Sequence, residues 1–275
     1  MSLSADAATA GIRRRQTRRA FITPAEVGLP ALAIAIILGV WQLSGLFLNP
    51  ILVSTPAAVA AELGALGANG AIWLALGQSL EEMVIGLAAG LIVGIGLGLL
   101  MGRYTLADKI LSPYVNFFNA TPLVVIIPLV IIWVGITIES RLLFVFLISL
   151  WPVLLNTVAG IRNVNRGYVD VGTAFGYTEA QIVRHISLPA AIPYILAGAR
   201  ISAGLAIIGM IVSEMEISFV GLGFLLVSFG NSFETAKLLA VVIVTSLLGV
   251  LNVTILKWVQ ATWFPWIAGS AAAAN

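Results

Sequence analysis

Long apolar runs limit how this chain can fold more than any other feature of its sequence. Several runs reach about 20 residues, the length that an α-helix needs to cross the hydrocarbon core of a bilayer. Backbone N–H and C=O groups find no partner in hydrocarbon, so each run must be helical. Strand-length segments of alternating polarity, which would indicate a transmembrane β-barrel, are absent from the sequence. We expect an all-α membrane protein with about six transmembrane helices, at residues 27–47, 79–101, 114–135, 141–161, 192–213 and 236–258.

The composition supports this class. The 275 residues are 60% hydrophobic and 9% charged, whereas a typical soluble domain is about one quarter charged. Cysteine is absent, so disulfides and thiolate chemistry are excluded and the redox compartment stays undecided. The pattern indicates one transmembrane domain at 27–262, between a basic tail at 1–26 and a C-terminal tail at 263–275.

Basic residues are distributed unevenly between the predicted loops. If the N-terminal tail is cytoplasmic, eleven of the 14 lysines and arginines fall on the cytoplasmic side, the bias that orients membrane proteins. The eleven are Arg13, Arg14, Arg15, Arg18, Arg19, Arg103, Lys109, Arg162, Arg166, Arg184 and Lys257. We expect a multi-pass protein of the cytoplasmic (inner) membrane with both termini in the cytoplasm. The pair Arg18-Arg19 also fits a twin-arginine export signal, but the apolar run after it is longer than the core of a signal peptide.

Proline interrupts the third apolar run. Pro122 lacks a backbone donor and crowds the preceding turn, so the helix should kink or break there. Broken helices at membrane depth usually line protein or a water-filled cavity. Thr121 and Pro122 are therefore candidates for a translocation path, and the alternative is a kinked helix that only packs.

Glycines recur in the second run with small-xxx-small spacing. Gly86, Gly90 and Gly94 would form a ridge that lets another helix approach closely. The ridge fits a subunit or pore interface and packing within the chain equally well. Glu81 and Glu82 are interpreted as charges at the start of this helix, where they suit its dipole.

Two predicted loops carry helix signals of their own. In residues 48–77, Thr55 and Pro56 fit the cap and first position of a short helix that runs to about Leu66. Residues 214–235 are apolar but contain several glycines, which favours a short re-entrant or surface segment over a span.

Arg200 and Glu214 lie within and just after the fifth run. A charge at that depth should face protein or water, or extend toward the interface. The two positions fall on nearly the same helix face, because their separation is close to four turns. We interpret both as candidates for the translocation path or a dimer interface, and the alternative is a structural pair or a capping contact.

A polar segment, DVGTAFGYTEAQIVRHISLP, separates the fourth and fifth runs. It predicts a short helix at 170–175 that ends at Gly176, then a second at 179–187 whose start fits a capping box of Thr178 and Gln181. Leu188-Pro189 would close the unit and redirect the chain. Two short helices with their own stop and start signals indicate a two-helix docking site for a partner, rather than a simple solvated loop.

This segment resembles the EAA loop of binding-protein-dependent ABC importer permeases, whose pattern is E-A-A, three residues, G, nine residues, I-x-L-P. Gly176, Ile186, Leu188 and Pro189 match at the right spacings, while Asp170-Val171-Gly172 departs from the first part. Segments elsewhere are similar to permeases of the nitrate/sulfonate/taurine branch, including LNTVAG at 155–160, LAGAR at 196–200 and SEM at 213–215. Asn156, in the first of these, is a further candidate for the translocation path.

The resemblance implies a type I ABC importer permease fold and three partners. A second permease copy would complete a dimer, most simply a homodimer. A cytoplasmic ATPase dimer, which holds ATP and Mg, would receive the loop at 165–189, called the coupling loop below. An extracytoplasmic solute-binding protein would deliver the solute for alternating access. The chain itself has no G-x-x-x-x-G-K-[ST] motif, so it is not expected to be an enzyme or to hold a cofactor. The residues implied for coupling are Asp170, Gly172, Ala174, Gly176, Thr178, Glu179, Arg184, His185, Ile186, Leu188 and Pro189.

Other functions are less consistent with the sequence. A self-contained channel or secondary transporter would usually place charges in mid-helix for gating or ion coupling, and charges are sparse here. A membrane enzyme would need an acid/base or metal constellation, and none is visible. For the solute, the resemblance implies a small organic or inorganic anion such as a sulfonate, taurine or nitrate, with a vitamin precursor or aromatic acid as the alternative.

Overall fold

The computed structural model describes residues 24–49 and 52–264, and all regular structure in these ranges is helical. This confirms the expected all-α class. The described residues divide into two units, with the boundary between Ala57 and Ala58. The arginines of the predicted N-terminal tail and residues 265–275 lie outside the described ranges.

The first unit contains α2 (Pro24–Phe47), which corresponds to the first predicted run. The chain after this helix is bonded back to it. Trp41 Nε1 donates to the carbonyl oxygen of Ser54 (2.8 Å), and the backbone N–H of Ala57 donates to Gln42 Oε1 (3.3 Å).

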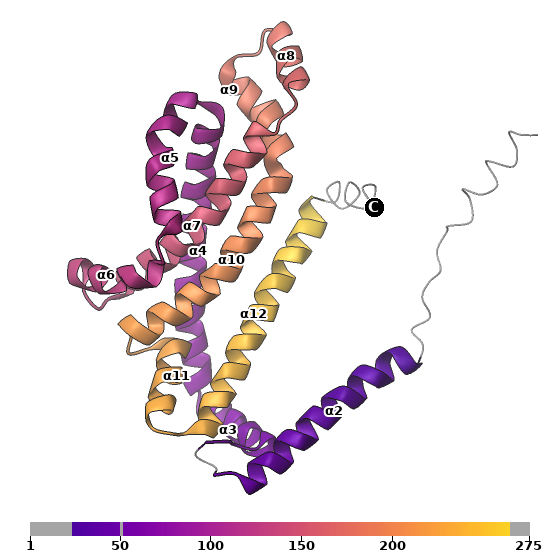
Figure 1. Ribbon diagram of the computed structural model, residues 1–275, viewed down its shortest axis with the longest axis vertical. Coiled ribbons are helices and arrows are strands. Elements are labelled where there is room, and N and C mark those ends of the chain that lie inside the picture. The colour runs from indigo at the N-terminus through magenta and orange to yellow at the C-terminus, as the bar shows by residue number, and fades with distance from the viewer. Residues whose placement is uncertain (1–23, 50–51, 265–275) are drawn as a thin grey trace, which may run out of the picture. The chain divides into compact units, whose positions relative to one another are not determined.

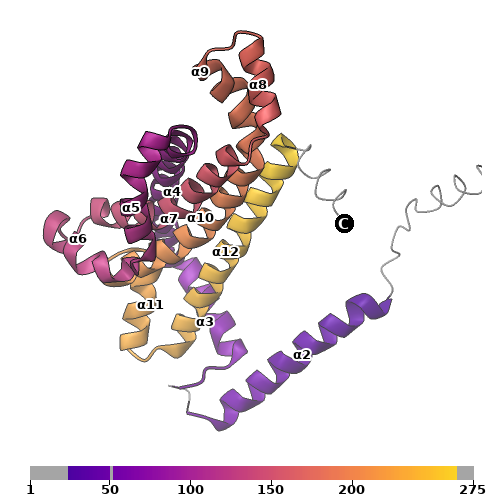
Figure 2. The same cartoon turned by 45° about the horizontal axis from the view of Figure 1, so that its top comes forward.

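Four long apolar helices dominate the second unit (Figure 1). They are α4 (Ala71–Arg103), α7 (Ile138–Arg162), α10 (Leu188–Ile217) and α12 (Thr235–Trp263). Each is long and apolar enough to cross a membrane, which confirms the second, fourth, fifth and sixth predicted spans. α7 lies between α4 and α10 and packs against both, and α12 runs along α10 (Figure 2).

The third predicted span is a bent pair. α5 (Thr105–Ala120) ends before Pro122, and the 3-10 turn η1 (Leu123–Ile126) leads into α6 (Ile127–Val134) at 94° to α5. The predicted break at Pro122 is therefore confirmed. With this pair counted as one span, the described residues contain up to five candidate spans, and α2 adds the shorter apolar stretch Leu32–Phe47.

Short helices lie where the loop signals predicted them. α3 (Pro56–Ala68) starts at the predicted proline, and α11 (Gly221–Asn231) is a short apolar helix between α10 and α12. α11 packs against α4, α10 and α12.

The glycine ridge of α4 packs against α7 within the chain. A Cβ on Gly90 would lie 2.9 Å from the Cβ of Ser149, and one on Gly94 would lie 2.9 Å from the carbonyl oxygen of Leu150. Gly86, Gly98 and Gly102 meet α7 in the same way. The two backbones are therefore as close as the small side chains permit. Of the two interpretations of the ridge, the described residues show intrachain packing.

Two expectations about helix ends were wrong. α4 begins at Ala71, not at 79, so Glu81 and Glu82 lie well inside the helix and are not charges of its first turn. The apolar residues before Ser79 simply extend the helix back to Gly70, whose φ of 81° sets its start.

The second correction concerns Leu188-Pro189, which does not redirect the chain. α9 (Glu179–Ile182), the π-helical turn η2 (Val183–Ser187) and α10 form one continuous helix, Glu179–Ile217. Proline in a helix lacks a donor and clashes with the carbonyl of the fourth preceding residue. The wider π turn directly before Pro189 accommodates that clash without ending the helix.

The glycine contact predicts a measurable difference between two alanine substitutions in α4. Gly94→Ala places a methyl group against the α7 backbone and should lower the free energy of unfolding by about 1–3 kcal/mol. Gly96→Ala, on the open face with nothing within 4 Å, is the matched control. Thermal unfolding of the purified protein in detergent measures both. An equal midpoint for the two variants would contradict the close contact.

Candidate functional site

The coupling loop forms a helical hairpin at one end of the second unit, with α8 (Arg166–Ala174) as its first arm (Figure 1). The predicted stop at Gly176 is confirmed. Its φ is 77°, and the backbone N–H of Tyr177 bonds to the carbonyl oxygen of Gly172 at 3.0 Å, closing the helix end. A Cβ on Gly176 would meet no atom within 4 Å, so the backbone conformation, not crowding within the chain, requires glycine.

The second arm begins with the predicted capping box. The backbone N–H of Thr178 donates to Gln181 Oε1 (2.8 Å), and the backbone N–H of Gln181 donates to Thr178 Oγ1 (3.4 Å). One ion pair ties the hairpin to α4, and another nearby ties the end of α7 to α5. Arg103, at the end of α4, bonds to Glu179 through its Nε at 2.9 Å, and Arg162, at the end of α7, lies 2.6 Å from Asp108 on α5.

Aromatic side chains surround an open cavity of about 540 Å³ between the two arms. Phe175 is 80% exposed and Tyr168 is 64% exposed. The other lining residues are Val171, Gly172, Tyr177, His185 and Ile186. Gly172 leaves room for Ile186, whose Cδ1 lies 2.6 Å from where a Cβ would stand, so the departure from the family's alanine has a local packing reason. Exposed aromatic groups around a hollow are typical of a surface that binds another protein.

Most of the remaining predicted coupling residues do not line this hollow. Ala174, Arg184 and Pro189 are exposed, Leu188 is half-buried, and His185 Nδ1 lies 3.0 Å from the carbonyl oxygen of Gln181. Asp170 faces a separate polar cavity of about 450 Å³, which Arg103, Arg162 and Arg166 also line.

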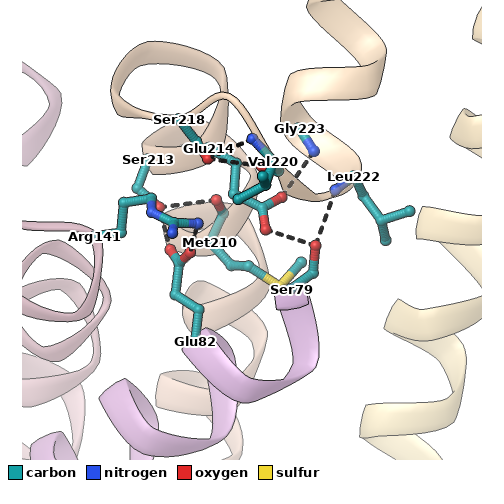
Figure 3. Close-up of polar contacts among 10 residues, drawn as sticks. All are labelled: Ser79, Glu82, Arg141, Met210, Ser213, Glu214, Ser218, Val220, Leu222 and Gly223. Atoms are coloured by element: carbon teal, nitrogen blue, oxygen red, sulfur yellow. Dashed lines mark hydrogen bonds and ion pairs between the residues drawn. The ribbon is translucent and has the colours of Figure 1, made fainter. Parts of the chain in front are cut away.

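A second polar group lies buried at the opposite end of the long helices, called the buried network below (Figure 3). Glu82 accepts hydrogen bonds from Arg141 (3.0 Å) and from the Ser213 hydroxyl. Glu214 accepts from the Ser79 hydroxyl (2.6 Å) and from the backbone N–H of Gly223 (2.7 Å). The backbone N–H of Leu222 donates to Ser79 Oγ (2.9 Å). In this buried network Arg141 is 8% exposed, and the four other polar side chains are fully buried: Ser79, Glu82, Ser213 and Glu214.

The candidates for the translocation path are not gathered in one place. Thr121 and Pro122 lie at the bend before η1, and Asn156 donates to the carbonyl oxygen of Pro152 (2.8 Å), on α7 where it faces α10. Arg200 is exposed and bonds to Gln260 on α12. Arg200 and Glu214 therefore have different partners, and the contact of Glu214 with Gly223 matches the capping alternative.

Sequence reasoning missed Ser79, Arg141 and Ser213 as site residues. Arg141 is not among the eleven basic residues assigned to the cytoplasmic side, and Glu82 was interpreted only as a helix-start charge. The available signal was the presence of opposite charges in two separate apolar helices, which usually pair inside the bundle.

Comparisons with known proteins relate the chain to membrane components of transport systems. Residues 86–267 match the family described as "Binding-protein-dependent transport system inner membrane component". A nitrate import permease of Synechocystis sp. is 29% identical, over 88% of this chain and 92% of the relative. A putative aliphatic sulfonates transport permease of Escherichia coli is 30% identical, over 84% and 88%. A taurine transport system permease of Escherichia coli is 27% identical, over 88% and 90%.

A solved structure shares the fold. A chain of the MetNI methionine ABC transporter, from a study of its inward-facing conformations, aligns with a TM-score of 0.54 and 20% identity, covering 66% of this chain and 93% of that chain. With the family match over most of the chain and relatives along nearly its whole length, this protein belongs to the inner-membrane components of binding-protein-dependent transport systems, that is, to the ABC importer permeases.

Proposed function

We propose that this permease imports a small organic or inorganic anion, of the sulfonate, taurine or nitrate kind, by alternating access driven by a separate ATPase. The coupling loop is the observation that carries the proposal. Its aromatic hollow stands free at the end of a membrane bundle and needs a protein partner to cover it. The orientation with both termini in the cytoplasm would put this hollow on the cytoplasmic side.

The partners follow from this placement. A cytoplasmic ATPase dimer, which supplies the ATP and Mg chemistry, binds the coupling loop of each permease copy, and two copies of this chain enclose the path. An extracytoplasmic binding protein supplies the solute. The names of the nitrate, sulfonate and taurine relatives support the anion class. A vitamin precursor or aromatic acid is the alternative solute.

Rigid helices would transmit a movement of the coupling loop to the membrane-spanning part of the chain. Its second arm is continuous with α10, and Arg103 of α4 holds Glu179 at the start of that arm. Closure of the ATPase dimer would then shift α4 and α10 as packed bodies between two arrangements.

Replacement of an exposed aromatic residue tests the docking surface. Phe175→Ser should reduce retention of the ATPase during gentle affinity purification by about tenfold or more, since aromatic anchors dominate protein interfaces. Thr173→Ala, in the last turn of α8 just before Phe175 but outside the cavity, is the control, because its side chain bonds only to the carbonyl oxygen of Val169. Quantitative mass spectrometry of the copurified proteins gives the ratio. Equal retention by the two variants would exclude the aromatic hollow as the docking site.

Gly176→Asp should uncouple hydrolysis from transport by placing a side chain where the ATPase surface approaches. ATP hydrolysis and solute uptake are measured together in proteoliposomes that contain the whole complex. Gly70→Asp is a matched control, since Gly70 has a similar φ of 81° and equally open surroundings but lies between α3 and α4. Normal uptake by Gly176→Asp would contradict the proposed approach of the ATPase. A loss in both variants would indicate backbone strain as the cause.

The solute is identified through the binding protein that copurifies with the complex. We expect uptake into proteoliposomes to require ATP and to be inhibited by a sulfonate, taurine or nitrate. Uptake that only a pyrimidine or an aromatic acid inhibits would favour the alternative solute. Transport by the chain alone, without ATP, would support a channel or secondary transporter instead.

A further inference from the structure

The first turn of α11 has no cap of its own. Val220, at the N-cap position, makes no side-chain bond to the free N–H groups of the helix start. Two of those groups are bonded by other helices instead: Leu222 N–H by Ser79 of α4, and Gly223 N–H by Glu214 of α10. The hydroxyl of Ser79 also donates to Glu214. One carboxylate therefore joins three helices (Figure 3).

The backbone of α11 leaves space for this carboxylate and for little else. Gly221 has a φ of 93°, and a Cβ there would collide with the carboxylate of Glu214. A Cβ on Gly223 would lie 2.6 Å from the Cβ of Glu214. Both glycines are required for the helix start to reach Glu214.

Ser213, which precedes Glu214, extends these contacts between helices to α7. Ser213 donates to Glu82, whose second oxygen accepts from Arg141. Two buried carboxylates thus face a single guanidinium, and hydroxyl and backbone N–H donors supply the remaining stabilisation. A buried carboxylate that loses its donors is strongly destabilised. Separation of α11 from Ser79 and Glu214 would therefore be strongly unfavourable, whereas movement of all of them together would not be.

One helix links this junction to the coupling loop. The continuous helix Glu179–Ile217 has 39 residues, which corresponds to about 58 Å at 1.5 Å per residue. Glu179 and His185 lie near one end of it, and Ser213 and Glu214 lie near the other. The helix is unbroken, so a displacement of the coupling loop reaches the buried network through a single rigid element.

We propose that Ser79 and Glu214 are positioning residues that fasten α11 to the far end of this helix, so that α11 moves with α10 when the ATPase closes. The inference rests on the proposed function and adds to it the element that responds to the coupling loop at the opposite end of the bundle. Within the described chain, α11 would then move in response to ATP binding at the end of the bundle opposite the coupling loop.

The test uses the natural absence of cysteine. Spin labels on Asn231→Cys of α11 and Ile208→Cys of α10, both exposed positions, report the distance between the two helices in the complete complex. In the labelled protein that retains Ser79, this distance should be the same in the nucleotide-free and ATP-trapped states. With Ser79→Ala it should differ between states or broaden. Uptake per ATP should fall about tenfold, the order expected from loss of a hydrogen bond to a charged group.

The control variant, and the results that would contradict this proposal, differ from those that test the proposed function. Ser149→Ala removes an equally buried hydroxyl that bonds only to a carbonyl of its own helix, and should leave the distance and uptake per ATP unchanged. The proposal is wrong if the interhelix distance changes between states before any substitution in the network. It is also wrong if Ser79→Ala transports normally, or if Ser79→Ala loses the ATPase altogether, which would indicate a purely structural role. If the unsubstituted chain binds no ATPase, the proposed function fails as well.

Discussion

The close contact between α4 and α7 determines where the other helices of the second unit can lie. Glycines at every fourth position of α4 bring its backbone against α7, and Gly198 and Gly209 of α10 do the same on the other side of α7. In a bilayer, burial from water contributes little between helices, so close van der Waals packing has to hold them. Three tightly packed helices provide a frame on which the coupling loop, the bent pair and α11 are carried.

Two clusters of polar groups lie at the two ends of this frame and serve different physical purposes. At the end that carries the coupling loop the ion pairs are partly exposed, so each contributes about 1 kcal/mol or less and can exchange partners readily. In the buried network the same kinds of groups are shielded, and every donor matters. One end is therefore suited to a reversible contact with another protein and the other to a fixed junction between helices.

Local signals in the sequence predicted well, and signals that depend on distant partners did not. The break at Pro122, the stop at Gly176 and the capping box at Thr178 follow from the chemistry of a few adjacent residues, and the structure confirms each. The helix through Pro189 and the role of Glu82 could not be predicted in this way. The first depends on a π turn upstream, and the second depends on Arg141, which is 59 residues away in the chain.

The pairing of Glu82 with Arg141 restricts how this permease can be recombined with its relatives. A related permease with a basic or neutral residue in place of Glu82 could not supply the carboxylate that Arg141 binds. An α4 exchanged alone for such a helix would leave Arg141 facing a like charge, or no charge, in a buried site. The two helices therefore form one exchangeable piece, and the identities of residues 82 and 141 are expected to change together or not at all.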